Sequence, residues 1–437
     1  MTSDILDITE QPLIDESIER YEWHEYEPRD KDLNKQGEIR IYIETQDLYT
    51  HPSESYLQIK GQLVKADGSA YANADSITLT NNALMYCFSQ IKYELGTQEI
   101  ESIANPGPAT TMLGLLKYPA DFTSAQGLNQ CWVKDNGTTG VIAENDGFAR
   151  RQVYIIQKPT TKGSFSFCIP LKHIFGFCDE YHKIVWGLKH TLSLVRTSDD
   201  DAIFGASAAG AAVNAVTAGA GKIIINKIAW RMPHVIPGLK EKNEFLKIVD
   251  SKASLPVAFK SRQSDSINVD QTTNFTWRLG FKTSPERPRY IIIGFQSGKS
   301  GDQTKNPAIF DHIKVKNAYL MLNTDRYPEV DYEISFPNMD ISSIYAAAAT
   351  FSSQFYGMDQ LITQSNITPI DFRDLFPLFV FDISKQNDRL KTSVVDIVFR
   401  AFFEENVGAN TQAYALLISD KFMKFKADGT KMIVETA

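Results

Sequence analysis

The sequence predicts an all-β protein made of two tandem β-sandwiches preceded by a short N-terminal arm. Short runs rich in β-branched and aromatic residues alternate with turns containing Gly, Pro, Asn and Asp, which is the pattern of strands. Few windows show the period of an amphipathic helix. The segment 174–196 resembles the segment 375–400, which indicates that one domain is present twice.

The first 35 residues are rich in acidic side chains and have few regularly spaced apolar positions. We therefore expect residues 1–35 to form an arm that adds nothing to a hydrophobic core. This stretch also lacks the basic and then apolar order of a secretory signal, which favours folding inside a cell.

The first half of the chain contains eight predicted strands and two long irregular segments. The irregular segments are 104–150 and 197–222, and we expect the second, rich in Ala and Gly, to be a mobile loop at an exposed end. The predicted strands are 39–44, 56–64, 76–80, 89–96, 151–157, 164–171, 190–196 and 222–232.

The second half repeats the same texture of short strands. The helix candidates are few, and the best are 344–350 and 355–366. The predicted strands are 255–263, 275–282, 289–296, 313–322, 393–403, 413–420 and 431–436.

The internal repeat decides the architecture. Ile174-Phe175 matches Leu375-Phe376, and Leu188-Lys189 matches Leu390-Lys391, near the end of each half. Two sandwiches of roughly eight strands each are typical of a double jelly roll. The Pro- and Gly-containing charged stretch 234–243 suits a domain join, so we expect an arm at 1–35, a first jelly roll at 36–236 and a second at 237–437.

Composition argues against two classes of partner. The net charge is -8, whereas proteins that wrap nucleic acid need a concentrated basic surface, so we expect no sequence-specific nucleic-acid binding. No apolar run is long enough to predict a membrane span. The four cysteines are scattered and read as reduced core thiols: Cys87, Cys131, Cys168 and Cys178.

The stretch GFQSGKSG at 294–301 resembles a phosphate-binding loop around Lys299. That motif needs four residues between its first Gly and the Gly-Lys pair, and a helix must follow it. Only three residues separate Gly294 from Gly298, and the residues that follow suit a loop. We expect a strand followed by an exposed loop, with no nucleotide site.

Two further clusters suggest metal ions but fit them poorly. Cys168, His173, Cys178 and His182 are close in sequence, but the paired Cys-x-x-Cys spacing of many zinc sites is absent. Asp199, Asp200 and Asp201 lack the punctuated loop of a calcium site, so a solvated acidic turn is favoured, although an interfacial calcium ion stays open. We therefore predict no metal, cofactor or catalytic residue.

No nucleophile elbow or serine triad is recognisable, so the chain is not predicted to be an enzyme. Carboxylate pairs for glycoside hydrolysis are a spatial feature that sequence spacing does not reveal. The alternative interpretation is therefore a carbohydrate-binding or carbohydrate-cleaving β-sandwich enzyme. A trimer without a signal peptide would favour the structural interpretation over this one.

Across nearly its whole length the chain resembles one known family. The resemblance is carried by HPSESYLQIKGQLVKADG, NNALMYCFSQIKYELGTQEIE, SFSFCIPLKHIFGF, AWRMPHV, PRYIIIGFQ, NPAIFDHIKVKNAYLMLN and LFPLFVFDIS. These stretches resemble the hexon-type major capsid proteins of Polinton (Maverick) elements and adintoviruses, which are related to virophage and adenovirus-like capsid proteins.

The resemblance implies a structural protein that acts by assembly. It implies a homotrimer that forms a pseudohexagonal capsomer, and many capsomers that tile an icosahedral shell around double-stranded DNA. The partners would be other copies of the chain, neighbouring capsomers and a minor or penton capsid protein, and the acidic arm would dock on a neighbour. The chain would be made and assembled inside the host cell and would reside in the virion.

Overall fold

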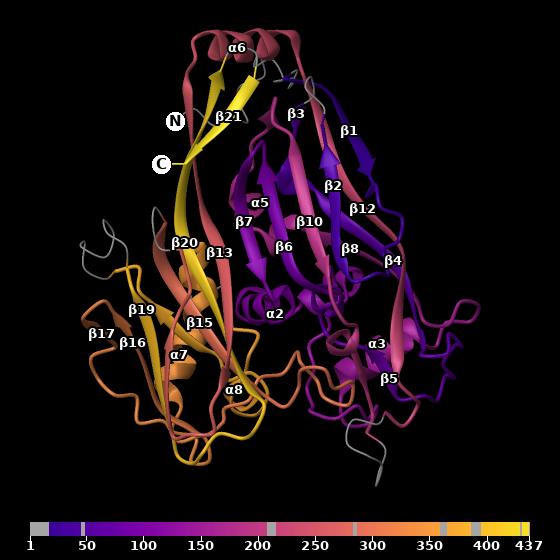
Figure 1. The fold of residues 1–437 in the computed structure, drawn as a ribbon, viewed down its shortest axis with the longest axis vertical. Coiled ribbons are helices and arrows are strands. Elements are labelled where there is room, and N and C mark those ends of the chain that lie inside the picture. Colours follow the sequence, from indigo (N-terminus) through magenta and orange to yellow (C-terminus); the bar gives the residue numbers. More distant parts are fainter. Residues whose placement is uncertain are drawn as a thin grey trace, which may run out of the picture.

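The computed structural model describes residues 17–44, 49–207, 216–282, 286–358, 365–385, 395–428 and 431–436. Two β-sandwiches lie side by side with their long axes roughly parallel (Figure 1). Strands at positions 18–237 pair with one another, and strands from residue 254 onward pair with one another.

The larger sheet of the first sandwich has six strands in the order β8-β4-β12-β3-β9, and β1 pairs with the other edge of β12. All its pairings are antiparallel. The strands are β1 (Ile18–Tyr26), β3 (Tyr49–Thr50), β4 (Tyr56–Lys65), β8 (Ser164–Pro170), β9 (Val185–Trp186) and β12 (Gly221–Pro237).

The facing sheet of the first sandwich has the order β2-β10-β6-β7. A separate pair, β11 with β5, lies at one end. The strands are β2 (Gly37–Ile43), β5 (Ile77–Leu79), β6 (Phe88–Leu95), β7 (Gln98–Ala104), β10 (His190–Arg196) and β11 (Ile203–Gly205).

The second sandwich has a sheet of order β13-β20-β15-β18, with β21 on β20, and a sheet of order β14-β19-β16-β17. Its strands are β13 (Ser254–Val269), β14 (Asn274–Arg278), β15 (Arg287–Ser297), β16 (Val315–Leu322), β17 (Asp325–Tyr327), β18 (Phe379–Asp382), β19 (Ile397–Phe403), β20 (Thr411–Asp428) and β21 (Lys431–Thr436).

Both sandwiches have the same topology. If the two-residue strands β3 and β9, the separate pair β5 and β11, and the final strand β21 are set aside, each sandwich has eight strands. In each, the first, eighth, third and sixth strands are neighbours in one sheet, and the second, seventh, fourth and fifth are neighbours in the other. This is the wrapped order of two tandem jelly rolls, and it confirms the predicted fold class.

The matching topology corrects the predicted arm. Residues 18–26 form β1, which pairs with β12 from Ile18 opposite Pro237 to Tyr26 opposite Trp230. Without β1 the first jelly roll would lack its first strand. Only residues 1–16 of the predicted arm lie outside the described residues.

Helices occupy connections that the sequence analysis left irregular. The predicted strand at 151–157 is wrong, because Asp146–Ile155 forms a helix whose N-cap is the side chain of Asn145, and 104–150 contains a buried helix. The prediction at 344–350 is confirmed. The helices are α1 (Ala83–Tyr86), α2 (Pro106–Lys117), α3 (Asp146–Ile155), α4 (Leu171–Ile174), α5 (Gly176–Glu180), α6 (Leu239–Asp250), α7 (Ser342–Tyr356) and α8 (Pro369–Asp374).

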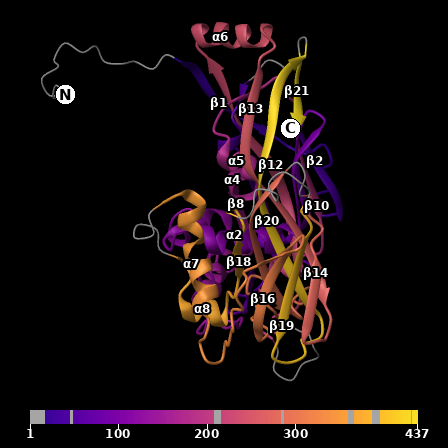
Figure 2. The same ribbon diagram turned by 90° about the vertical axis from the view of Figure 1, so that its left-hand side faces the viewer.

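The helix predicted at 355–366 falls largely outside the described residues, since α7 ends at Tyr356 and 359–364 are not described. Figure 2 shows α7 and α8 on one flank of the strands, while α6 lies at the end of the molecule near β21. None of the helices among the described residues has the length and apolar character needed to span a bilayer.

The segment 197–222 is only partly the exposed loop that its composition predicts. Ile203, Phe204 and Gly205 form the buried strand β11, and the ring of Phe204 lies 5.4 Å from that of Phe148. Residues 208–215 lie outside the described residues. A short apolar run therefore forms a strand and pairs with β5, although the rest of the segment is rich in small residues.

The internal repeat is correct in its strands and wrong in its aromatic clusters. Strands β10 and β19 both occupy the seventh place of a jelly roll. In contrast, Ile174-Phe175 follow the sixth strand of the first sandwich, whereas Leu375-Phe376 precede the sixth strand of the second. Leu390-Lys391 lie outside the described residues.

Candidate functional site: the junction between the two sandwiches

Lys299, the lysine of the predicted near-miss phosphate loop, is held in an internal ion pair. Its Nζ donates to the carbonyl of Ile309 and to Oδ1 of Asp311, both at 2.8 Å. Burial lowers the pKa of Lys299 despite the nearby carboxylate. The loop after β15 opens no helix before residue 311. A phosphate-binding loop needs a helix N-terminus directly after its glycines, and that arrangement does not occur here.

The structure does not bring the Cys/His cluster together. His173 is half-buried and its Nδ1 lies 2.7 Å from Oε1 of Gln130, whereas His182 is exposed. Cys178 is buried in α5, and Cys168 is half-buried in β8. Among the described residues no group of three or more His, Cys, Asp or Glu side chains is arranged to hold a metal ion. The prediction of no metal site stays a prediction.

The sequence predicted that the acidic turn 199–201 is solvated, but its three carboxylates accept hydrogen bonds from the protein. Asp199 accepts from the backbone N–H of Ile223, within the first sandwich, at 2.8 Å. Asp200 accepts from Nε2 of Gln303 at 2.9 Å, and Asp201 accepts from the N–H of Gly301 at 2.6 Å. Gln303 and Gly301 belong to a loop of the second sandwich, so this turn clamps the two sandwiches together.

Glu101 is the central polar residue of the junction. It lies on β7, is fully buried, and accepts three backbone hydrogen bonds. Two come from Gly176 at 3.0 Å and Phe177 at 2.7 Å in the first sandwich, and the third comes from Arg262 of β13 at 2.9 Å. Burial raises the pKa of Glu101 to about 7, although Arg262 and these N–H groups favour the charged form.

A buried ion-pair network surrounds this carboxylate. The guanidinium of Arg262 donates to Oδ2 of Asp179 at 2.7 Å and to the carbonyl of His173 at 3.1 Å. Lys117, at the end of α2, pairs with the same carboxylate. Burial raises the pKa of Asp179, but the two cations outweigh it and the net shift is downward. Burial lowers the pKa of Lys117 to about 8.

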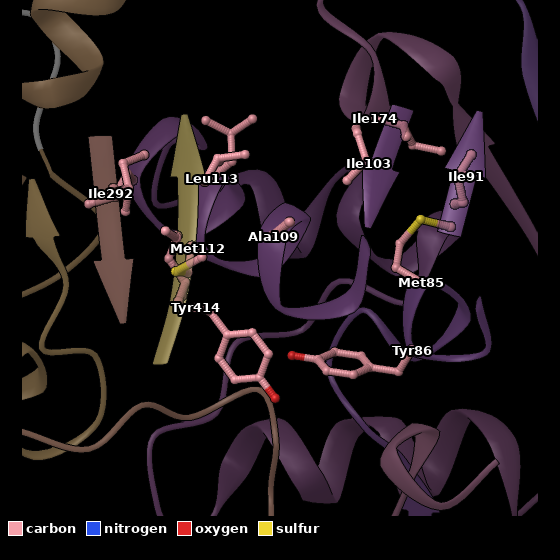
Figure 3. Close-up of a cluster of buried hydrophobic side chains, with 14 of the residues drawn as sticks. Met85, Tyr86, Ile91, Ile103, Ala109, Met112, Leu113, Ile174, Ile292 and Tyr414 are labelled. Carbon is pink, nitrogen blue, oxygen red and sulfur yellow. The ribbon is translucent and has the colours of Figure 1, made fainter. Parts of the chain in front are cut away.

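Helix α2 supplies the apolar part of the junction (Figure 3). All its residues are buried, and Met112 and Leu113 lie beside Ile292 and Tyr414 of the second sandwich. The Tyr86 hydroxyl donates to the carbonyl of Pro307 at 2.8 Å across the junction. The backbone of α2 packs closely against the Tyr86 ring at Gly107. A Cβ added at Gly107 would lie only 2.4 Å from that ring.

The junction fixes the orientation of one jelly roll relative to the other. Its charged groups are paired and hydrogen-bonded, which is the condition under which buried charges are tolerated. Sequence reasoning missed Glu101, Arg262 and Asp179, because no local motif marks them. The one available signal is a carboxylate at an inward position of a strand, flanked by the buried Ile100 and Ile103.

Comparison with solved structures shows the same fold in viral capsid proteins. A chain of the Sputnik virophage particle matches 100% of this chain and 92% of its own length, with a TM-score of 0.61 and 9% identity. The Faustovirus major capsid protein matches with a TM-score of 0.57 and 8% identity, covering 98% of this chain and 93% of its own. At these identities the likeness shows the fold.

The mavirus major capsid protein matches with a TM-score of 0.56 and 11% identity, covering 95% of this chain and 90% of its own. These matches indicate no catalytic family. A search of curated proteins finds no match. A family model described as a double jelly roll-like domain matches residues 77–423, which include strands of both sandwiches. The chain therefore belongs to the double jelly roll-like domain family.

Proposed function

We propose that this chain is the major capsid protein of an icosahedral double-stranded DNA virus or virus-like transposon. The observation that carries the proposal is the pair of jelly rolls with identical strand order, joined by the buried contacts around Glu101. The likeness to the mavirus and Faustovirus major capsid proteins over nearly the whole chain supports it. Placement in the Polinton–adintovirus group stays a prediction.

Three copies form the capsomer under this proposal. Cyclic closure of three chains places six similar sandwiches around one axis, which gives a pseudohexagonal outline that can tile a shell. Such a ring requires a heterologous contact, in which one face of a chain meets a different face of its neighbour. A rigid angle between the two sandwiches is needed, because a hinge there would prevent closure.

The edge strand β1 offers a surface for such a contact. Ile18 and Trp23 are each 49% exposed, and the Trp23 ring packs on that of Tyr56 at 5.3 Å. An exposed edge strand with large apolar side chains is a site where another chain commonly binds. We assign β1 to the contact between copies, and we assign no catalytic role to the chain.

The domain limits and remaining partners follow from the same proposal. The first jelly roll ends with β12 at Pro237 and the second begins with β13 at Ser254, so the predicted join at 236–237 falls where the strands of the first sandwich end. A minor or penton capsid protein would occupy the positions that six-sided units leave open in a closed shell. The protein would reside in the virion after assembly in the host cell.

Light scattering of the purified full-length chain tests the proposal. We expect the mass of three chains at micromolar concentration, and we expect Trp23→Ser to shift the equilibrium toward the single chain while that chain stays folded by circular dichroism. A mass of one chain at every accessible concentration would count against the capsomer. If Trp23→Ser leaves the trimer intact, the assignment of β1 to the contact between copies is wrong, and the proposed capsomer stands.

A further inference from the structure

Helix α6 lies at one end of the molecule, where it connects the last strand of the first sandwich to the first strand of the second (Figures 1 and 2). None of its residues is buried, although Phe245, Ile248 and Val249 are large and apolar. Their spacing of three and four residues places them on one face of the helix. That face lines an apolar cavity of about 200 Å³.

Both sandwiches contribute walls to this cavity. Tyr49 and Trp186 come from the first sandwich, and their stacked rings have centroids 5.9 Å apart. The ring of Phe245 on α6 lies 5.6 Å from that of Tyr49. Phe425 of β20 and Met432 of β21 come from the second sandwich. A molecule in the cavity would therefore contact both jelly rolls and the helix that connects them.

Two polar groups set the chemistry that the cavity can accept. Lys183 lines the cavity, is exposed, and makes no ion pair with a described residue. Among the described residues that line the cavity there is no Asp or Glu. Tyr49 is only 6% exposed, and its hydroxyl makes no hydrogen bond with a described residue. A cation and a free donor favour an anionic, hydrogen-bond-accepting group at the polar end of a ligand.

The volume of the cavity limits the apolar part of the ligand. Apolar cavities of this kind stay dry and take up small apolar molecules instead of water. At about 30 Å³ for each water-sized group, the cavity holds roughly seven such groups. A methylene group is similar in size, so a straight aliphatic chain of roughly eight carbons fills the space.

We propose that the cavity binds a medium-chain carboxylate. The aliphatic chain lies among the aromatic side chains of both sandwiches, and the carboxylate lies at the mouth near Lys183. Such a ligand would join the two jelly rolls at the α6 end of the molecule, in addition to the junction around Glu101. This site goes beyond the proposed capsid function, because each chain carries the whole cavity.

Calorimetry of the full-length protein with alkyl carboxylates tests the apolar part. We expect one octanoate per chain, bound roughly fifteenfold more tightly than hexanoate, because each buried methylene strengthens binding about fourfold. Decanoate should gain much less over octanoate, since the cavity is then full. Binding should also show a negative heat-capacity change, which marks burial of apolar surface.

A matched pair of variants on α6 places the binding site. Val249→Trp adds bulk at a residue that lines the cavity, and it should weaken octanoate binding at least tenfold. Leu246→Trp adds the same side chain at a position that is 43% exposed and outside the lining, and it should leave the affinity unchanged. Circular dichroism should show both variants folded, because α6 buries no residue.

Lys183→Gln tests the charged end of the ligand. An exposed ion pair is weak, so we expect octanoate to bind about threefold less tightly to this variant. Binding of 1-octanol, which has the same chain and no charge, should not change. Added salt should reduce the octanoate affinity of the wild type and have little effect on that of the variant.

Four results would overturn the proposal. No saturable octanoate binding at millimolar concentration, or equal loss of affinity in Val249→Trp and Leu246→Trp, would remove the ligand from the cavity. Equal effects of Lys183→Gln on octanoate and 1-octanol would rule out recognition of the carboxylate. If octanoate instead separates chains that light scattering shows to be associated, the cavity belongs to a contact with a second copy.

Discussion

Gly176 lies at a close approach between the two sandwiches. Its N–H donates to Glu101, and a Cβ added there would lie 1.7 Å from the carbonyl oxygen of Lys260. Backbone cannot yield as a flexible side chain can, so even one methyl group must push β13 away from the first sandwich. The tolerance of this position is a measure of how tightly the junction is packed.

We predict that Gly176→Ala destabilises the protein by about 1–3 kcal/mol, the usual cost of overpacking. Gly408→Ala is the matched control, because the nearest atom to a Cβ there is 4.0 Å away. Denaturant unfolding of both variants measures the effect. Equal midpoints for the two would show that the junction adapts more readily than the Gly176 contacts indicate.

Glu101 should make the stability of the junction depend on pH. Burial raises its pKa to about 7 in the folded protein, above the ordinary value of 4.5. A raised carboxyl pKa means that the folded state binds the proton more tightly, so this contribution is complete below pH 4.5 and is lost as pH rises to about 7. The loss is on the order of 3 kcal/mol at most.

Comparison with Glu101→Gln isolates this contribution. Burial lowers the pKa of His173 and of His190 to about 3, and these histidines destabilise the folded protein as pH falls, which is the opposite slope. Urea unfolding of wild type and variant between pH 4.5 and 7.5 should show the wild-type advantage shrinking as pH rises. An advantage that grows with pH would mean that the three N–H donors outweigh burial.

No local sequence pattern could have identified this residue-scale network. The hydrogen bonds of Glu101 reach residues 75, 76 and 161 positions away, and only the packing of two jelly rolls brings them together. Lys299 shows the opposite case, since its sequence motif failed a spacing test and its side chain is paired with Asp311. Residue spacing could reject a site here but could not find the junction.

At the scale of elements, strand β1 is the part of the predicted arm that the fold requires. Its inward-facing positions hold Glu22, His24 and Tyr26, while Tyr21 and Trp23 face outward. This reverses the usual rule that the buried face is the apolar one, so the alternation gave no strand signal. Tyr26 makes the arrangement workable, because its hydroxyl lies 2.9 Å from Nε2 of His234 on β12.

Two deletions should therefore behave differently. Removing residues 2–16 should leave the unfolding temperature of the sandwiches within a few degrees of the full chain, since β1 stays in place. Removing residues 2–26 strips β1 from β12 and exposes an unpaired edge, so we expect a large fall in the unfolding temperature and aggregation. Calorimetry and solubility measure both, and equal behaviour of the two deletions would show that β1 is dispensable.

Helix α2 shows why the connections were harder to predict than the strands. Its sequence, PGPATTMLGLLK, contains the residues that usually mark turns. The prolines lie in its first turn, where they cost no hydrogen bond, and Gly107 and Gly114 permit contact with the rings of Tyr86 and Trp132. Tertiary packing stabilises this helix, and the local sequence pattern does not reveal that packing.

At the scale of the whole molecule, duplication explains most of what the sequence could predict. Alternating strands such as β2, with Ile39, Ile41 and Ile43 buried, identify themselves. Two similar series of strands then imply two similar sandwiches, and the identical strand order bears this out. The angle between the two sandwiches could not be predicted from the sequence, because it depends on buried polar contacts between residues far apart in the chain.

Electron microscopy of the purified full-length chain tests the central claim most directly. If the chain is a capsid protein, class averages should show a particle with threefold symmetry and a near-hexagonal outline, built of six similar densities, one for each jelly roll. Glu101→Gln weakens the junction, so its class averages should lose the sharp near-hexagonal outline under conditions where the trimer has not yet dissociated. Isolated two-lobed particles at micromolar concentration, with no threefold class, would contradict the account.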